Sequence, residues 1–228
     1  EEQQVAFEEI AANLDVDEFG NHLLYGVTGS GKTEVYIHAL KKALEQGKGG
    51  LVLVPEIGLT PQIVRRFHMI FGDDIAVLHS RLTNRERYDA WRALQKGDKR
   101  IAIGARSAVF APVQNLGLIV VDEEHDSSYK QESPAPRYHG RDAAIVRGKL
   151  NDATVILGSA TPSMVSLYGA RKGKSKYLTL SSRPSGSTLP KVKVLDMKQY
   201  KSAMKGPIAI PIYEAIQKAV SKDEQAIL

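Results

Sequence analysis

The sequence predicts an α/β domain with a mostly parallel, doubly wound sheet and helices on both of its faces. Short apolar runs recur along the first 160 residues, and most are continuous rather than alternating, which is typical of strands covered on both faces. Segments with a helical spacing of apolar residues separate these runs. Strands that alternate with helices favour a parallel sheet over a meander of hairpins.

Six apolar runs are the predicted strands: HLLY (22–25), LVLV (51–54), IAVLH (75–79), RIAIGA (100–105), LIVVD (118–122) and TVILGSA (154–160). A helix is expected over 32–46, where apolar residues form one stripe and Gly47 then ends it. Pro61 begins the next predicted helix, which carries IVRRFHMIF. Thr83 and Glu86 have the spacing of a capping box ahead of a third, ERYDAWRALQKG.

The composition changes after about residue 181, where SSRPSGSTLP is rich in Ser, Pro and Gly and indicates a linker. We therefore expect one domain over residues 1–181 and a second segment over 182–228. That segment contains a possible strand, VKVLDM, and a possible helix, PIYEAIQKAVSKDEQ. We expect it to lead into the rest of a longer polypeptide.

Composition limits the classes of function. The 228 residues are 43% hydrophobic and 25% charged, which is ordinary for a globular protein. The chain has no cysteine, which excludes disulfides and thiolate metal sites and is compatible with a reducing cytoplasm. No apolar run approaches the roughly 20 residues that span a bilayer, so a membrane partner is not expected. The net charge of +5 permits a polyanionic partner.

A glycine-rich motif, GVTGSGKT, follows the first predicted strand and opens the first predicted helix. This order of strand, loop and helix is the context expected of a phosphate-binding loop, although a chance glycine-rich turn is the alternative. Glycines let backbone N–H groups approach phosphate oxygens, and the helix N-terminus adds positive potential. Lys32 is expected to contact the β- and γ-phosphates, and the Thr33 hydroxyl to bind Mg²⁺. The predicted ATP-binding residues are Gly26, Val27, Thr28, Gly29, Ser30, Gly31, Lys32 and Thr33.

A second motif, DEEH, closes the strand LIVVD. Asp122 is placed to hold Mg²⁺ at the carboxyl end of a strand, and Glu123 to polarise the attacking water. His125 is placed to connect this centre to whatever moves. A solvated acidic turn is the alternative, but it does not account for the four apolar residues that precede the motif.

Together, GVTGSGKT, DEEH and GSATP (158–162) resemble the first RecA-like P-loop NTPase lobe of a DEAH-like superfamily 2 helicase. Three further stretches are similar to the replication-restart helicases of that superfamily: VPEIGLTPQ (54–62), GARSAVFAP (104–112) and DEEHDSSYKQESPAPRYHGRD (122–142). The resemblance covers about residues 1–200. It implies a 3′-to-5′ ATP-dependent DNA helicase of primosome assembly, with single-stranded and forked DNA, other primosome proteins and single-strand-binding protein as partners.

The resemblance also assigns roles to single residues. Gln3 matches the glutamine that reads adenine, with its neighbour Gln4 as the alternative. Ser159, Ala160 and Thr161 match the motif that couples the nucleotide state to the DNA-holding surface.

Aromatic and basic residues alternate in the stretch after DEEH. Bases stack on rings while phosphates meet cations, so this stretch suits single-stranded DNA, although a surface loop packed on the lobe is the alternative. In the resembling family a loop at this position couples DNA contact to ATP hydrolysis. The loop lacks the family's tryptophan, and we expect Tyr138 to stack. The predicted DNA contacts are Arg106, Ser107, Tyr129, Lys130, Arg137, Tyr138 and His139, with a structural salt bridge as the alternative for Arg106.

In helicases of this superfamily a second lobe supplies arginines that complete the catalytic site, and a cysteine-bound zinc module is expected elsewhere in the polypeptide. We therefore expect residues 1–228 alone to bind nucleotide weakly, to hydrolyse it poorly and not to unwind DNA. Two other classes of function share parts of the pattern. A small-molecule kinase would use the same loop but hydrolyse or transfer phosphate without DNA, and a nucleic-acid-binding module could have lost catalysis.

Overall fold

The computed structural model describes residues 1–56, 58, 60–182, 192–200 and 204–227. The chain divides into two compact units, residues 1–187 and 188–228. Most of the predicted linker, residues 183–190, lies outside the described residues.

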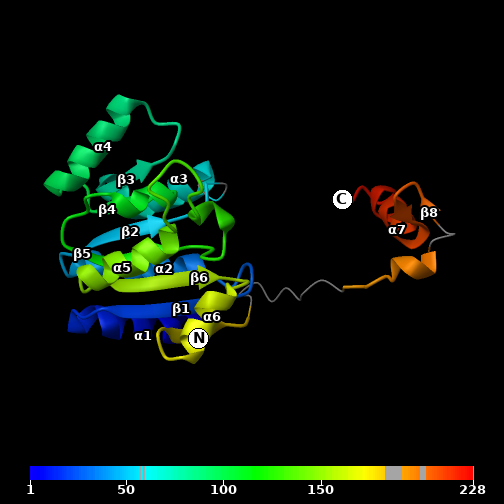
Figure 1. The fold of residues 1–228 in the computed structure, drawn as a ribbon, viewed down its shortest axis with the longest axis horizontal. Coiled ribbons are helices and arrows are strands. Elements are labelled where there is room, and N and C mark those ends of the chain that lie inside the picture. Colours follow the sequence, from blue (N-terminus) through cyan, green and yellow to red (C-terminus); the bar gives the residue numbers. More distant parts are fainter. Residues whose placement is uncertain (57, 59, 183–191, 201–203, 228) are drawn as a thin grey trace. The chain divides into compact units, whose positions relative to one another are not determined.

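The first unit is built on a seven-stranded sheet whose strand order is β3-β4-β2-β5-β6-β1-β7 (Figure 1). Every neighbouring pair is parallel, which confirms the α/β class and makes this sheet wholly rather than mostly parallel. The six predicted strands are present. The strands are β1 (Gly20–Gly26), β2 (Gly49–Leu53), β3 (Ile75–Leu78), β4 (Ile101–Gly104), β5 (Leu116–Val121), β6 (Thr154–Ser159) and β7 (Lys176–Leu180).

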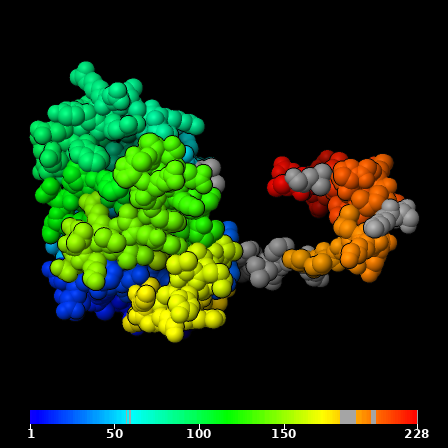
Figure 2. Space-filling model, viewed as in Figure 1, coloured from blue at the N-terminus to red at the C-terminus, as the bar shows by residue number. Residues whose placement is uncertain are grey.

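Helices cover both faces of the sheet. The core on one face contains residues of α1 (Glu2–Val16), α2 (Lys32–Glu45) and α3 (Pro61–Phe71). The core on the other contains residues of α4 (Asn84–Lys96) and α5 (Gly140–Leu150), with α6 (Met164–Arg171) packed beside them. Figure 2 shows the face that carries α4, α5 and α6. Three short 3₁₀ helices, η1 (Gly72–Asp74), η2 (Arg106–Phe110) and η3 (Ser127–Tyr129), complete the unit.

The predicted helix boundaries follow from local chemistry. Thr60 caps α3 by accepting a hydrogen bond from the Ile63 N–H, and Pro61 is its first residue. Thr83 and Glu86 form the reciprocal capping box at the start of α4. These contacts confirm two helix starts that the sequence predicts.

The second unit contains η4 (Met197–Tyr200), a hairpin of β8 (Met204–Lys205) and β9 (Ile208–Ala209), and α7 (Ile210–Val220). The helix predicted near its end is therefore present. The strand predicted at VKVLDM is wrong, because residues 192–196 have no regular structure and Met197 begins η4. Within the described ranges, no helix has the length and apolar character needed to cross a bilayer.

Sheet order positions the motifs. β6 lies between β5 and β1, with Val121 opposite Leu157 and Ser159 opposite Tyr25. Because the three strands are parallel, their carboxyl ends lie at one edge of the sheet. The chain segments that carry GVTGSGKT, DEEH and GSATP therefore leave the sheet side by side.

A buried histidine makes the first unit sensitive to pH. His22 in β1 is 3% exposed, and burial lowers its pKa from 6.5 to about 4. The unfolded chain therefore binds this proton more tightly than the folded one. Above about pH 6.5, His22 is neutral in both the folded and the unfolded chain and does not lower the free energy of unfolding. That free energy falls as the pH is lowered from 6.5 toward 4.

Replacing this histidine should flatten that dependence. We expect the free energy of unfolding of His22→Phe to change less between about pH 5 and pH 7 than that of the wild type, because phenylalanine cannot take up the proton. Urea unfolding of both proteins at the two pH values measures the difference. Equal changes in the two proteins would show that His22 does not titrate as its burial implies.

Candidate nucleotide and DNA site

The loop between β1 and α2 is shaped to receive an anion. Gly29 and Gly31 have φ values of 80° and 89°, which side-chain-bearing residues rarely adopt. A Cβ on Gly26 would lie 2.5 Å from the Ser30 hydroxyl, so all three glycines are required by the loop itself. Lys32 is the first residue of α2, and its ammonium donates to the Gly26 carbonyl oxygen at 2.8 Å. The loop thus surrounds a helix N-terminus and a buried cation, a combination that binds phosphate.

The acidic motif faces this loop from the end of β5. Glu123 Oε1 lies 3.9 Å from the Lys32 ammonium. The Asp122 carboxylate accepts a hydrogen bond from the Tyr36 hydroxyl at 3.0 Å. Tyr36 reaches it past Gly158, where a Cβ would lie only 1.6 Å from the hydroxyl oxygen. This close approach explains why GSATP begins with glycine.

Asp122 is in an environment that favours a cation partner. Burial raises the pKa of its carboxyl group, and the charge of Glu123 raises it further, whereas Tyr36 and Lys32 act in the opposite direction. Two neighbouring carboxylates and the half-buried Thr33 hydroxyl are hard oxygen donors. The residues present therefore fit a magnesium ion.

A cavity of about 510 Å³ lies between the two motifs. Its lining brings together most of the predicted nucleotide residues and adds two that no sequence motif marks, Glu34 and Arg66. The lining residues are Gln3, Thr28, Gly29, Ser30, Gly31, Lys32, Thr33, Glu34, Arg66, Asp122 and Glu123. Gly26 and Val27 complete the loop behind this lining.

Gln3 and Gln4 have different surroundings. Gln3 donates from its amide to the Ser30 carbonyl oxygen at 2.8 Å and lines the cavity. Gln4 donates to Glu8, one turn further along α1, and lines a smaller neighbouring hollow. The geometry favours Gln3 as the residue nearer the phosphate loop, and its adenine contact stays a prediction.

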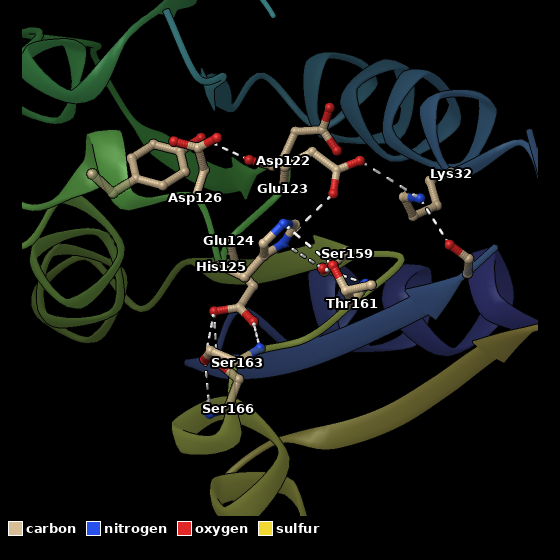
Figure 3. A network of polar contacts seen from close by, with 12 residues as sticks. Lys32, Asp122, Glu123, Glu124, His125, Asp126, Ser159, Thr161, Ser163 and Ser166 are labelled. Carbon is tan, nitrogen blue, oxygen red and sulfur yellow. Dashed lines mark hydrogen bonds and ion pairs between the residues drawn. The ribbon is translucent and has the colours of Figure 1, made fainter. Parts of the chain in front are cut away.

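His125 connects the acidic motif to the segment after β6 (Figure 3). Its Nδ1 lies 2.7 Å from the Ser159 hydroxyl and 3.7 Å from Glu123 Oε2, and its Nε2 lies 3.3 Å from the Thr161 hydroxyl. Ser159 also accepts from the Thr161 N–H at 3.0 Å, and Ala160 supplies the backbone between them. The predicted coupling residues therefore contact the predicted catalytic histidine.

The prediction that Tyr129 contacts DNA is wrong. Its side chain is 0% exposed, and its hydroxyl donates to the Asp122 carbonyl oxygen at 2.7 Å. Burial raises the pKa of this hydroxyl well above its ordinary value, so it stays protonated and remains a donor. Tyr129 is thus a core residue that supports the acidic motif and has no ring surface for a base.

Arg106 holds the segment that follows DEEH. Its guanidinium donates to the carbonyl oxygens of Ser128 and Lys130 at 3.0 and 3.1 Å, rather than to a carboxylate. The salt bridge considered for it is therefore absent from the described contacts. Ser107 is exposed beside it. Arg106 is only partly free to meet a phosphate.

The remaining predicted DNA residues gather around a second cavity of about 540 Å³, which we call the aromatic-basic hollow. It is lined by Lys130, Gln131, Glu132, Arg137, Tyr138 and His139. Tyr138 packs edge-on against Phe110, with ring centroids 5.1 Å apart, and the Arg106 guanidinium lies 5.8 Å from the Tyr138 ring. Phe110 is 55% exposed, and it is not among the residues predicted to contact DNA. Aromatic rings beside cations can stack with bases, and base stacking at this hollow stays a prediction.

Comparisons with known proteins identify the family and the fold of the chain. The chain is 46% identical over its whole length to the replication restart protein PriA of Bacillus subtilis and to that of Chlamydia pneumoniae. It spans 28% and 31% of the length of these two relatives. Among solved structures, RecG bound to a three-way DNA junction matches this chain with a TM-score of 0.68 at 24% identity. The match covers 97% of this chain and 28% of the RecG chain.

The Hef helicase domain of Pyrococcus furiosus also matches 97% of this chain, over 44% of its own, with a TM-score of 0.56 at 18% identity. These two likenesses show that the fold is that of a helicase RecA-like lobe. The family model described as DEAD/DEAH box helicase matches residues 1–167. This chain belongs to the DEAD/DEAH box helicase family.

Proposed function

We propose that this chain is the ATP-binding lobe of a 3′-to-5′ DNA helicase that acts in replication restart in the bacterial cytoplasm. The observation that carries the proposal is the meeting of the phosphate loop and the DEEH motif around one cavity, with His125 joining that motif to Ser159 and Thr161. The relatives that match the whole chain are named replication restart proteins, which supports the same function here. Single-stranded and forked DNA, other primosome proteins and single-strand-binding protein are the proposed partners.

The proposed chemistry divides the work among the residues at this edge. The loop amides and Lys32 bind the triphosphate, and Lys32 is held at the cavity by the Gly26 carbonyl. Thr33 and Asp122 would hold magnesium, which would neutralise phosphate charge. Glu123 orients the attacking water and accepts its proton. His125 couples ATP hydrolysis to the Ser159–Thr161 turn, because it lies within 4 Å of both Glu123 and Ser159.

The proposed DNA contact is the aromatic-basic hollow. Tyr138, supported by Phe110, stacks on a base, while Lys130 and Arg137 meet phosphates. Burial lowers the pKa of His139, so this side chain is neutral at pH 7 and acts as a hydrogen-bonding group. Ser107 and the unshared N–H groups of Arg106 extend the phosphate contact beyond the hollow. None of these groups needs to read a base edge, which suits a translocating motor.

Removing the proposed base should stop turnover without preventing binding. In the full-length protein we expect Glu123→Gln to lower the DNA-stimulated ATPase rate by about 100-fold or more, because glutamine cannot accept a proton. ATP affinity should stay within about threefold, because the phosphate contacts are intact. Steady-state ATPase assays and titration of a fluorescent ATP analogue measure the two quantities.

Glu45→Gln is the matched control, since Glu45 is exposed and lies about 20 Å along α2 from Lys32. It should behave as the wild type does. Retained turnover in Glu123→Gln would contradict the assignment of the base. ATP hydrolysis that does not respond to single-stranded DNA would instead favour a small-molecule kinase.

The two tyrosines of the segment after DEEH should separate DNA binding from stability. We expect Tyr138→Ala to weaken single-stranded DNA binding by about 1–3 kcal/mol, the usual cost of one lost stacking partner, with little effect on unfolding. Tyr129→Phe should leave DNA affinity unchanged and lower the free energy of unfolding by about 1 kcal/mol through its lost hydrogen bond. Fluorescence anisotropy with a labelled oligonucleotide and urea unfolding measure both. If Tyr129→Phe weakened DNA binding and Tyr138→Ala did not, Tyr129 rather than Tyr138 would be the DNA contact.

A further inference from the structure

Glu124 is the third of three consecutive acidic residues, and it points away from the nucleotide cavity. Glu123 has a φ of 44°, a left-handed conformation that is uncommon for a residue with a side chain. This turn directs Glu123 toward Lys32 and Glu124 toward Ser163 and Ser166 (Figure 3). Glu124 is 0% exposed, so the chain buries a carboxylate that the proposed chemistry does not use.

The buried carboxylate is fully bonded. Its Oε1 accepts from the Ser163 N–H at 2.6 Å. Its Oε2 accepts from the Ser163 and Ser166 hydroxyls at 3.1 and 2.8 Å, and from the Arg141 guanidinium at 3.1 Å. Ser163 is the N-cap of α6, so the carboxylate also lies at the positive end of that helix. These contacts fix the start of α6, and with it the segment that follows Thr161.

Arg141 brings a third part of the chain to the same point. It is 7% exposed, lies in the first turn of α5, and donates to the Ser163 hydroxyl at 2.9 Å as well as to Glu124. It also donates to the half-exposed Asp142 at 2.8 Å. α5 begins directly after His139, the last residue lining the aromatic-basic hollow. The Glu124–Arg141 pair therefore joins the end of β5, the end of the hollow and the start of α6.

We propose that Glu124 and Arg141 are positioning residues that transmit DNA binding at the aromatic-basic hollow to His125 and the Ser159–Thr161 turn. The inference rests on the proposed function. A displacement of residues 130–139 by DNA moves the first turn of α5, and Arg141 carries that movement to Glu124 and Ser163. Ser163 lies two residues after Thr161, whose hydroxyl contacts His125. A buried ion pair suits this task, because moving one partner away from the other would leave a buried charge uncompensated.

The test uses the full-length protein and three variants: Glu124→Gln, Arg141→Gln and the double variant. For each we expect the Kd for an oligonucleotide, the KM for ATP and the DNA-free ATPase rate to stay within about threefold of wild type. The stimulation of ATPase by saturating single-stranded DNA should fall at least about tenfold. Arg141→Gln leaves the buried Glu124 without its counter-charge, and Glu124→Gln leaves Arg141 only the exposed Asp142, so each single variant should also lower Tm.

The double variant separates positioning from stability, because it leaves no unpaired buried charge and should regain Tm. If its DNA stimulation stays low while Tm recovers, the pair transmits the DNA signal. If stimulation recovers together with Tm, the pair is only structural and the inference is overturned. Asp74→Asn/Arg100→Gln is the matched control, since these residues pair at 2.7 Å directly before β3 and β4, at the other end of the strand order from β1 and β7. It should keep full stimulation.

The same assays distinguish this inference from the proposed function. A wild-type ATPase that single-stranded DNA does not stimulate removes the proposed function and the inference together. A stimulated wild type with equally stimulated single and double variants overturns the inference alone.

Discussion

The order of three parallel strands is the constraint on which the rest of the molecule depends. β5, β6 and β1 are neighbours, so the segments that leave their carboxyl ends share one edge of the sheet. The clearest sign of their meeting is Lys32, whose ammonium lies between the Gly26 carbonyl and the Glu123 carboxylate. A different strand order would separate the phosphate loop from the DEEH motif. Neither of these two motifs alone could hold both a triphosphate and its metal.

The left-handed turn at Glu123 divides the work of the acidic motif. Asp122 and Glu123 remain on the cavity side, where burial and then the charge of Glu123 raise the pKa of Asp122, an environment that favours a bound cation. Glu124 is directed to the opposite side and becomes a structural anchor. Around Asp122, two buried tyrosines donate hydrogen bonds, Tyr36 to its carboxylate and Tyr129 to its carbonyl oxygen. The strand end is thus held rigidly while its carboxylates stay available.

Much of the fold and part of the site follow from local sequence. The six predicted strands are continuous apolar runs, and the starts of α3 and α4 carry capping residues, so both are visible without tertiary information. β7 cannot be recognised in this way. It lies at the edge of the sheet, three of its five residues are exposed, and Thr179 breaks its apolar pattern. VKVLDM has the apolar residues of a strand, but the described structure provides no neighbouring strand for it to pair with.

The misassigned and missed residues share one cause: their roles depend on contacts between distant parts of the chain. Tyr129 lies in a polar stretch and resembles a surface ring, yet its hydroxyl bonds to the backbone of Asp122. Glu124 looks like one more solvated acid, and its partner Arg141 is 17 residues away. Phe110 gains significance only because Tyr138 packs against it. No periodicity or motif marks such pairs in advance.

The most direct test of the central claim is a crystal structure of this chain with magnesium and a non-hydrolysable ATP analogue. We expect the triphosphate to lie on the backbone amides around Ser30 and Gly31, with the metal between the Thr33 hydroxyl and the Asp122 carboxylate. Nucleotide bound at any other surface, or a metal that does not approach Asp122, would contradict it.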